Sequence, residues 1–190
     1  MYWDTLPEST IEDILTDKDT DCILEEFYIS DNYRLVEETF HNCLQSPLIS
    51  PYKVLFLQVI DSYHAGNYDL AALGLISISD GMLSDVSGKS THHAQKRVDV
   101  IMEKINSNLP IEAIDYSTII LTSTLFETCS SLWKGESFEE TEPTLLNRNW
   151  LIHGRSRRQV SKLDCIKIIN YLYGIILLNN LLNPNSNDST

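Results

Sequence analysis

The sequence has few cysteines, and none is placed to hold a metal. The four among 190 residues stand at positions 22, 43, 129 and 165, without a C-x-x-C pair and without a histidine at zinc-ligand spacing. Isolated thiols of this kind are typical of core positions in a reducing compartment rather than of a disulfide framework. We therefore expect no metal site and no fold held by disulfides.

A long uninterrupted apolar run is also missing. The most apolar stretch, residues 166–182, is broken by Lys167, Asn170, Asn179 and Asn180, so it is too polar to span a bilayer and predicts a buried helix. The first ten residues, MYWDTLPEST, lack the basic start and apolar core of a signal peptide. The expectation is a cytoplasmic protein without a membrane partner.

Positive charge is scarce overall but concentrated in one place. The chain has 14 Lys and Arg against 27 Asp and Glu, a net charge of −13, which argues against indiscriminate binding of nucleic acid. Within residues 148–167, six basic residues against one acid give +5, which leaves −18 for the rest. This basic segment indicates either an anion-binding surface or a solvated helix end. Its cations are Arg148, Arg155, Arg157, Arg158, Lys162 and Lys167.

The chain shows no internal repeat and no period-two alternation of convincing length. Apolar residues recur instead at helical spacing, for example over 98–105, opposite a polar face. The sequence therefore predicts an all-α fold. We expect an N-terminal helical extension over residues 1–50, packed on a helical domain over 51–182, and a flexible polar tail at 183–190.

Capping and turn residues predict the ends of several helices. Asn32 is expected to cap the helix that carries Val36, Phe40 and Cys43, and two prolines mark residues 45–51 as a loop.

Ser9 and Thr91 are expected to cap further helices, and Gly66 and Asn67 to separate two long ones. The latter two helices are expected over 52–64 and 68–86.

Three helices are expected in the last part of the chain. One long apolar helix covers 113–133, and a final helix runs from Ser161 to Leu182. Between them, Pro143 can open a short helix that ends near His153, with Gly154 just beyond it.

The candidate chemistry lies in residues 146–155, LNRNWLIHGR. Arg148 and His153 are five residues apart, about 140° on an ideal helix, yet a long Arg side chain and a His on the last turn can converge on one anion. Attack by an RNA 2′-hydroxyl on its phosphate needs proton transfer, which a histidine can perform near neutrality. An arginine with two aligned N–H groups can stabilise the charge on the phosphate. The alternative is that the two residues only cap a helix end or lie exposed on it, without a chemical role.

Other patterns predict less. Residues 88–90 read GKS, but Leu83 stands where a phosphate loop has its earlier glycine, so this match is rejected. The adjacent His92 and His93 are typical of exposed polar residues at a helix start rather than of a metal site. The nine tyrosines are scattered and form no stacking platform for single-stranded nucleic acid.

Two segments carry a family resemblance. LNRNWLIHGR resembles the R-x4–6-H motif of the HEPN superfamily, in which a polar residue often follows the Arg, and is most similar to a bacterial branch with a motif near L-N-R-H/N-x-x-x-H-G-R. Residues 65–81, AGNYDLAALGLISISDG, resemble a second feature of that branch, a helix that opens with G-N-Y and ends in an acidic residue plus Gly. The resemblance covers most of the last two-thirds of the chain.

The resemblance implies a specific activity. HEPN domains are helical bundles that usually dimerise, so that two motifs form one composite ribonuclease site, and many act as toxins or in antiviral abortive infection. It therefore implies an HEPN-like bundle with extra N-terminal helices that cleaves RNA without metal or cofactor, as a homodimer, in bacterial defence or as a toxin. By carry-over, Arg148 binds the scissile phosphate, His153 transfers protons and Asn149 orients one of them.

Charge and position, rather than the resemblance, add four expected RNA contacts: Arg155, Arg157, Arg158 and Lys162. Some toxin members carry a Tyr two residues after the His. This chain has Arg155 there, so regulation by modification of such a Tyr is not expected.

Two other interpretations stay open. A non-catalytic HEPN-like module could dock a protein, such as an antitoxin or another defence-system protein, or hold RNA without cutting it; its RNA binding would be salt-sensitive. A plain helical interaction protein could instead use the basic segment to meet an acidic partner, and replacing Arg157 and Arg158 should then abolish partner binding.

Overall fold

The computed structural model describes residues 9–10, 12, 16, 19–89, 93–108, 116–135, 139 and 141–184. Within these ranges every regular element is a helix and no strand occurs, so the predicted all-α fold is confirmed. In chain order the elements are α2 Thr20–Ser30, α3 Arg34–Gln45, the 3-10 helix η2 Pro47–Tyr52, α4 Lys53–His64, α5 Tyr68–Ser87, α6 Ala94–Asn108, α7 Tyr116–Leu132, α8 Arg148–Ile152 and α9 Lys162–Leu182.

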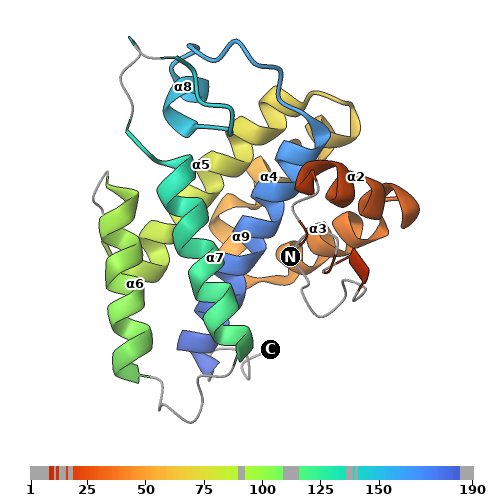
Figure 1. Ribbon diagram of the computed structural model, residues 1–190. Helices are drawn as coiled ribbons and strands as arrows, with labels where there is room; N and C mark the ends of the chain where they lie inside the picture. Colours follow the sequence, from red (N-terminus) through yellow and green to blue (C-terminus); the bar gives the residue numbers. More distant parts are fainter. Residues whose placement is uncertain are drawn as a thin grey trace.

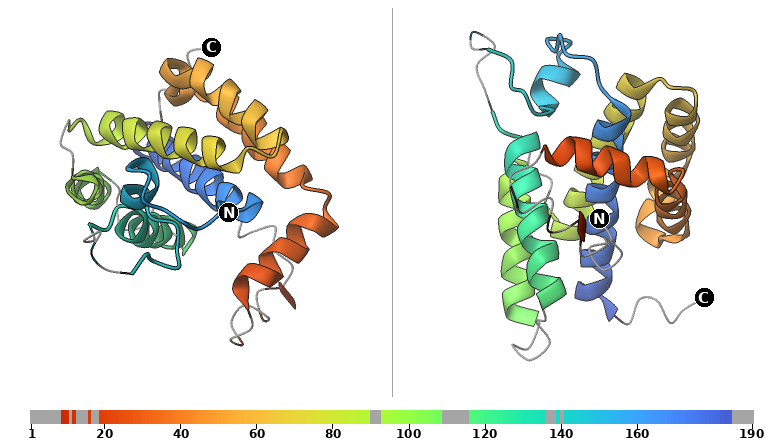
Figure 2. Two further views of the ribbon diagram at one scale, coloured as in Figure 1. Left: turned by 90° about the horizontal axis from the view of Figure 1, so that it is seen from above. Right: turned by 45° about the vertical axis from the view of Figure 1, so that its right-hand side comes forward.

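Helix α9 runs through the middle of the molecule (Figure 1). It contacts α3, α5, α6 and α7, and the views in Figures 1 and 2 place α6 and α7 on one side of it and α2 and α3 on the other. Twelve of its 21 residues are buried. A helix that is apolar on most of its circumference needs neighbours all round, which this arrangement supplies.

Helices α5 and α9 are each long and apolar enough to cross a membrane, by length and composition alone. More than half of each apolar window is buried inside the fold, where the two helices pack against each other. Such burial is typical of core helices. Residues 166–182 thus lie in a buried helix, as predicted.

A capping box fixes the start of α9. The Ser161 hydroxyl accepts the Asp164 N–H at 3.1 Å, and the Asp164 carboxylate accepts the Ser161 N–H at 2.8 Å. Two N–H groups that the first helical turn leaves unpaired are satisfied in this way. The predicted start of the final helix at Ser161 is confirmed.

Helices α4 and α5 form a tight antiparallel pair. Gly66 follows α4 in a left-handed conformation, with φ 77°, at the predicted break between the two helices. Asn67 takes the N-cap position of α5, but its side chain makes no capping hydrogen bond. Further along α5, a Cβ on Gly74 would lie 2.3 Å from Val59 Cγ2, so only glycine allows the two helices to approach this closely.

The connection between α3 and α4 is more regular than predicted. Residues 45–51 were expected to form a loop because of their two prolines, yet Pro47–Tyr52 is a 3-10 helix. Pro47 stands in the first turn, where its missing N–H leaves no bond unmade, and the Ser46 hydroxyl accepts the Leu48 N–H at 3.3 Å. The prediction was wrong because prolines exclude an α-helix interior but not a short 3-10 turn.

The cap of α3 also differs from the prediction. Asn32 and Tyr33 both have left-handed backbone, with φ of 49° and 58°, and Tyr33 holds the cap position without a side-chain hydrogen bond. The Asp31 carboxylate instead accepts the Leu35 N–H at 3.0 Å. Asn32 is used for its tolerance of the left-handed conformation, and an acid one residue earlier supplies the acceptor.

The N-terminal helices are attached to α9 by polar contacts. Lys167 forms an ion pair with Asp21 of α2, and Asn170 Nδ2 donates to the Tyr28 hydroxyl at 2.9 Å. The helix expected from Ser9, the Thr91 cap and the tail from residue 185 lie mostly or wholly outside the described residues.

Candidate functional site

Helix α8 carries the R-x4-H motif and stands at one end of the bundle (Figure 1). Asn147, in extended conformation, caps it: its Oδ1 accepts the N–H groups of Asn149 at 2.9 Å and Trp150 at 3.3 Å. The predicted start near Pro143 is wrong, because the helix begins only after this cap and has five residues. The predicted end is confirmed, since His153 is the C-cap.

The C-terminal end of α8 is closed by a left-handed glycine. Gly154 has φ 62°, and the next N–H, that of Arg155, donates to the Trp150 carbonyl at 2.9 Å. This arrangement satisfies a carbonyl that the helix leaves unpaired and turns the chain sharply. The exposed His153 therefore lies at the turn between α8 and Arg155.

The structure brings Arg148 and Asn149 into contact. Arg148 Nη1 donates to Asn149 Oδ1 at 3.1 Å, and Asn149 Nδ2 donates to the Lys134 carbonyl at 3.3 Å. Both side chains are partly exposed. The Asn149 side chain thus joins Arg148 to the backbone beyond α7.

Asn147 is a site residue that the sequence analysis missed. It is 5% exposed, and its Nδ2 donates to the same Lys134 carbonyl at 3.0 Å. One buried amide thus caps α8 and ties it to the chain beyond α7. An Asn directly before the Arg of the motif was the available signal, since Asn is among the strongest N-cap residues.

Arg148 and His153 stand at opposite ends of this short helix. Five residues of α-helix advance about 7.5 Å along the axis, so the two residues are separated by roughly that axial distance. In chemical terms, the helix places a permanent cation and an imidazole at its two ends.

Residues 155–157 continue the exposed positive surface. Arg155 and Arg157 are exposed. Glu142 holds the backbone here, because it accepts the Ser156 hydroxyl and, at 2.8 Å, the Arg157 N–H. The hydrogen bond from Ser156, followed by that from Arg157, lowers the pKa of the Glu142 carboxyl.

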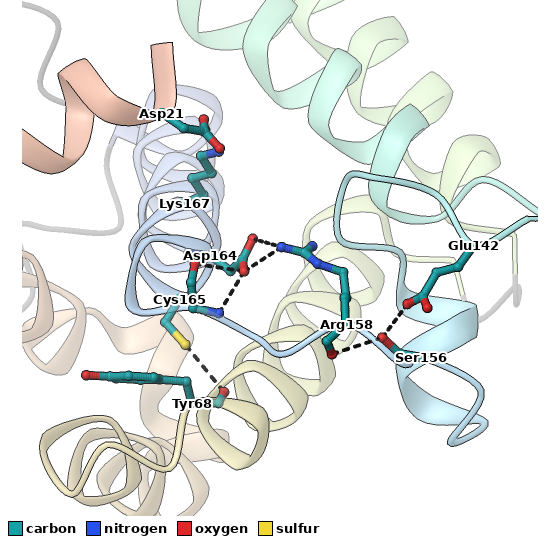
Figure 3. Close-up of polar contacts among 9 residues, drawn as sticks. Asp21, Tyr68, Glu142, Ser156, Arg158, Asp164, Cys165 and Lys167 are labelled. Carbon is teal, nitrogen blue, oxygen red and sulfur yellow. Dashed lines mark hydrogen bonds and ion pairs between the residues drawn. The ribbon is translucent and has the colours of Figure 1, made fainter. Parts of the chain in front are cut away.

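Arg158 has a structural partner. Its Nη2 donates to both oxygens of Asp164, at 3.0 and 2.8 Å, as Figure 3 shows. Asp164 is 8% exposed and belongs to the capping box of α9. The Arg158 charge is therefore used largely to hold the entry to α9, although the sequence predicts an RNA contact.

Lys162 also points into the protein. Its Nζ lies 3.2 Å from the centroid of the Tyr33 ring and 5.6 Å from that of Tyr63. Desolvation lowers the pKa of this lysine, against an opposing effect of Glu37. Arg158 and Lys162 thus make contacts within the fold, whereas Arg155 and Arg157 are exposed.

An apolar groove lies beside the motif. It has a volume of about 380 Å³ and is bounded by α2, α7, α9 and the residues just before Asn147. Asn170 and Thr128 are among the polar side chains at its wall. Its leucines come from all four boundaries: Leu24, Leu121, Leu125, Leu132, Leu145, Leu146, Leu163 and Leu177.

The described residues contain no group of three His, Cys, Asp or Glu side chains that could hold a metal ion. His92, one of the adjacent histidines, lies outside them. Comparison with protein-family models, curated proteins and solved structures finds no significant match to this chain. A functional assignment therefore depends on the geometry of α8 and the residues around it.

Proposed function

We propose that this chain is a metal-independent endoribonuclease of the HEPN type, acting as a homodimer in bacterial defence or as a toxin. The observation that carries the proposal is the construction of α8. A single capped helix presents Arg148, oriented by Asn149, at its first residue and His153 at its last turn. The arrangement suits an anionic substrate whose reaction needs proton transfer.

The proposed reaction uses the substrate as its own nucleophile. The 2′-oxygen attacks the adjacent phosphorus, its proton passes to a base, and the bond from phosphorus to the 5′-oxygen breaks as that oxygen receives a proton. The products are a 2′,3′-cyclic phosphate end and a free 5′-hydroxyl end. Arg148 would stabilise the added negative charge on the phosphate, and His153 would transfer protons.

A homodimer supplies the second proton-transfer group. One imidazole cannot be protonated and deprotonated at the same instant, so a base and an acid on opposite sides of the phosphate call for two histidines. Each chain offers one His153. Two copies of α8 facing one phosphate would meet this requirement, as in the composite site implied by the resemblance.

The structure narrows the set of residues proposed to bind RNA. Arg155 and Arg157 are exposed next to His153, and we assign them to the phosphates flanking the cut. Arg158 and Lys162 are engaged by Asp164 and Tyr33, so we assign them to folding instead. The acidic remainder of each chain would repel RNA that does not enter between the basic segments of the two copies in the dimer.

The deciding experiment is RNA cleavage in the presence of EDTA. Wild type, Arg148→Ala and His153→Ala are incubated with single-stranded and structured RNA, and product ends and molecular mass in solution are measured. We expect cyclic phosphate ends from a dimeric wild type and a loss of about 10²–10⁴-fold in both variants, with unchanged melting temperature. Cleavage by a strictly monomeric protein, or cleavage abolished by EDTA, would contradict the proposal.

The apolar groove favours a second candidate, a non-catalytic module that docks a protein partner such as an antitoxin. Leu145 and Leu146 line the groove directly before the motif, so an apolar segment bound there would also contact the base of α8. This candidate predicts salt-sensitive RNA binding or none, and no cut ends in the same assay.

A further inference from the structure

The hydrogen bond between Asn149 and Arg148 continues to the backbone just beyond α7. Asn149 bonds Arg148 through Oδ1 and the Lys134 carbonyl through Nδ2. The same carbonyl also accepts the amide of Asn147. The position of one backbone carbonyl, just beyond the end of α7, therefore sets both the cap of α8 and the side chain that holds the arginine.

The residue before that carbonyl, Trp133, is itself held by a carboxylate. Its Nε1 donates to Asp80 Oδ1 at 3.1 Å, and its ring packs on Tyr171 with 5.6 Å between centroids. Asp80 belongs to α5 and Tyr171 to α9, the two central helices. An indole hydrogen-bonded at its edge and packed on its face has little freedom to rotate.

The carboxylate is fixed in turn by a buried arginine. Arg97 of α6 is 1% exposed, and its Nη2 lies 2.8 Å from Asp80 Oδ1. Its Nη1 donates to the Asp80 carbonyl and, at 2.9 Å, to the Ser84 hydroxyl. Asp80 Oδ1 thus receives both a guanidinium and an indole N–H.

Stability gives only a weak reason for such a pair. Desolvation of a buried guanidinium offsets much of its attraction to a carboxylate, and apolar replacements of buried ion pairs are often as stable. What the pair contributes is direction, because its hydrogen bonds have fixed geometry. In this chain Arg97 fixes the Asp80 carboxylate, and Asp80 fixes the Trp133 indole. The next residue, Lys134, offers the carbonyl that holds α8.

We infer that Trp133, anchored by the Asp80–Arg97 ion pair, is a positioning residue for Arg148. The inference assigns Arg148 its phosphate-binding role from the proposed function. Helix α8 has five residues, far fewer than an isolated helix needs, so its orientation depends on contacts at its ends. Loosening the Lys134 carbonyl would let Asn149 and the Arg148 guanidinium turn away from the phosphate, and a displacement of about 1 Å can slow a reaction about 10²-fold.

The test is Trp133→Phe, which keeps an aromatic ring against Tyr171 and removes the N–H that bonds Asp80. Tyr171→Phe is the matched control: its hydroxyl is buried beside the Cys129 thiol, and no hydrogen bond joins it to Trp133 or Asp80. The first readout is the ¹⁵N NMR signals of the Arg148 side chain and the Asn149 amide. We expect both to shift or broaden in Trp133→Phe and to stay in place in Tyr171→Phe.

The second readout is kinetic. In Trp133→Phe we expect kcat to fall about tenfold with KM changed less than about twofold, since the interaction with the phosphate is strongest in the transition state. Tyr171→Phe should retain the wild-type kcat. A structural role alone would lower the melting temperature without separating kcat from KM in this way.

A second variant covers the case in which Trp133→Phe does not fold. Asn147→Asp retains the capping oxygen of α8 but loses the donor to the Lys134 carbonyl, so the same NMR signals should move. Unmoved Arg148 and Asn149 signals in a folded variant would overturn the inference, whatever the RNA assay shows. If the signals move but wild type cuts no RNA, the positioning stands and the ribonuclease proposal fails.

Discussion

The two halves of the basic segment carry three cations each and differ in structure. In residues 148–157 the arginines lie at the surface around α8. In residues 158–167 each cation meets a partner from within the fold: Arg158 bonds Asp164, Lys162 lies over the Tyr33 ring and Lys167 pairs with Asp21.

This difference shows that a charge count overstates the positive surface. All six cations contribute equally to the +5 of the segment. Three of them are compensated by a carboxylate or an aromatic face, and their field on a ligand is correspondingly weaker. The exposed arginines of the first half, Arg155 and Arg157, are therefore better placed to meet an anion.

The largest expected difference between the two halves is in their contribution to the free energy of unfolding. Arg158→Ala should lower the free energy of unfolding by about 2–3 kcal/mol, because it leaves the buried Asp164 without its two-bond partner. Arg157→Ala, one residue away and exposed, should change it by less than about 0.5 kcal/mol. Urea denaturation compares the two. Equal losses would mean that the second half is no more structural than the first.

The next effect concerns RNA binding. Replacing Arg155 and Arg157 together by Ala should weaken binding about tenfold and lower the slope of log K against log salt by about 1 to 2. Replacing Lys162 and Lys167 by Met removes the same charge, yet should lower the slope by less than about 0.5. Titrations of single-stranded RNA at several salt concentrations measure the slope for both double variants. Equal slopes would contradict the distinction between the exposed and the engaged cations.

A smaller effect tests the contact of Lys162 with Tyr33. Lys162→Met preserves the apolar stem and removes the charge, and should cost about 0.5–1 kcal/mol of unfolding free energy. Tyr33→Phe keeps the aromatic face and should leave the effect of Lys162→Met unchanged. A double-mutant cycle by urea denaturation measures the loss of unfolding free energy from Lys162→Met with Tyr33 and with Phe at position 33. If the loss disappears in the Tyr33→Phe background, the interaction depends on the hydroxyl instead of the ring.

The smallest effect is a pH dependence at Glu142. Its folded pKa is lowered below 4.5, chiefly by the bond from Ser156, so its contribution to stability is present at neutral pH and is lost as pH falls through the folded pKa. Glu142→Gln should therefore lower the melting temperature slightly at pH 7 and leave it unchanged near pH 3. A constant difference between wild type and variant from pH 3 to 7 would contradict this.

The sequence predicts the helical class and the buried final helix well, because those depend on local periodicity. The Ser161 start of α9, the Gly66 turn and the end of α8 before Gly154 all follow from residue types with one preferred geometry. The boundaries at Asn32 and Pro143 were missed because several neighbouring residues could serve as caps, and only packing selects one.

The candidate site is predictable only in part, for a different reason. The motif itself is contiguous, so Arg148, Asn149 and His153 could be proposed together. The partners of Arg158 and Lys162 are set by the fold, and Tyr33 comes from a distant helix connection. The contact of Asp80 with Trp133 joins separate helices and leaves no local pattern in the sequence.

The contrast among the four thiols has a practical consequence. Burial raises the pKa of Cys43 and Cys165 to about 12 and that of Cys129 to about 11, so these three resist alkylation. Cys22 is exposed on α2, and chiefly the Glu26 carboxylate raises its pKa, so it reacts best in mildly alkaline buffer. The native chain therefore accepts a single spin label without mutagenesis, and the label-to-label distance would report how two copies are arranged.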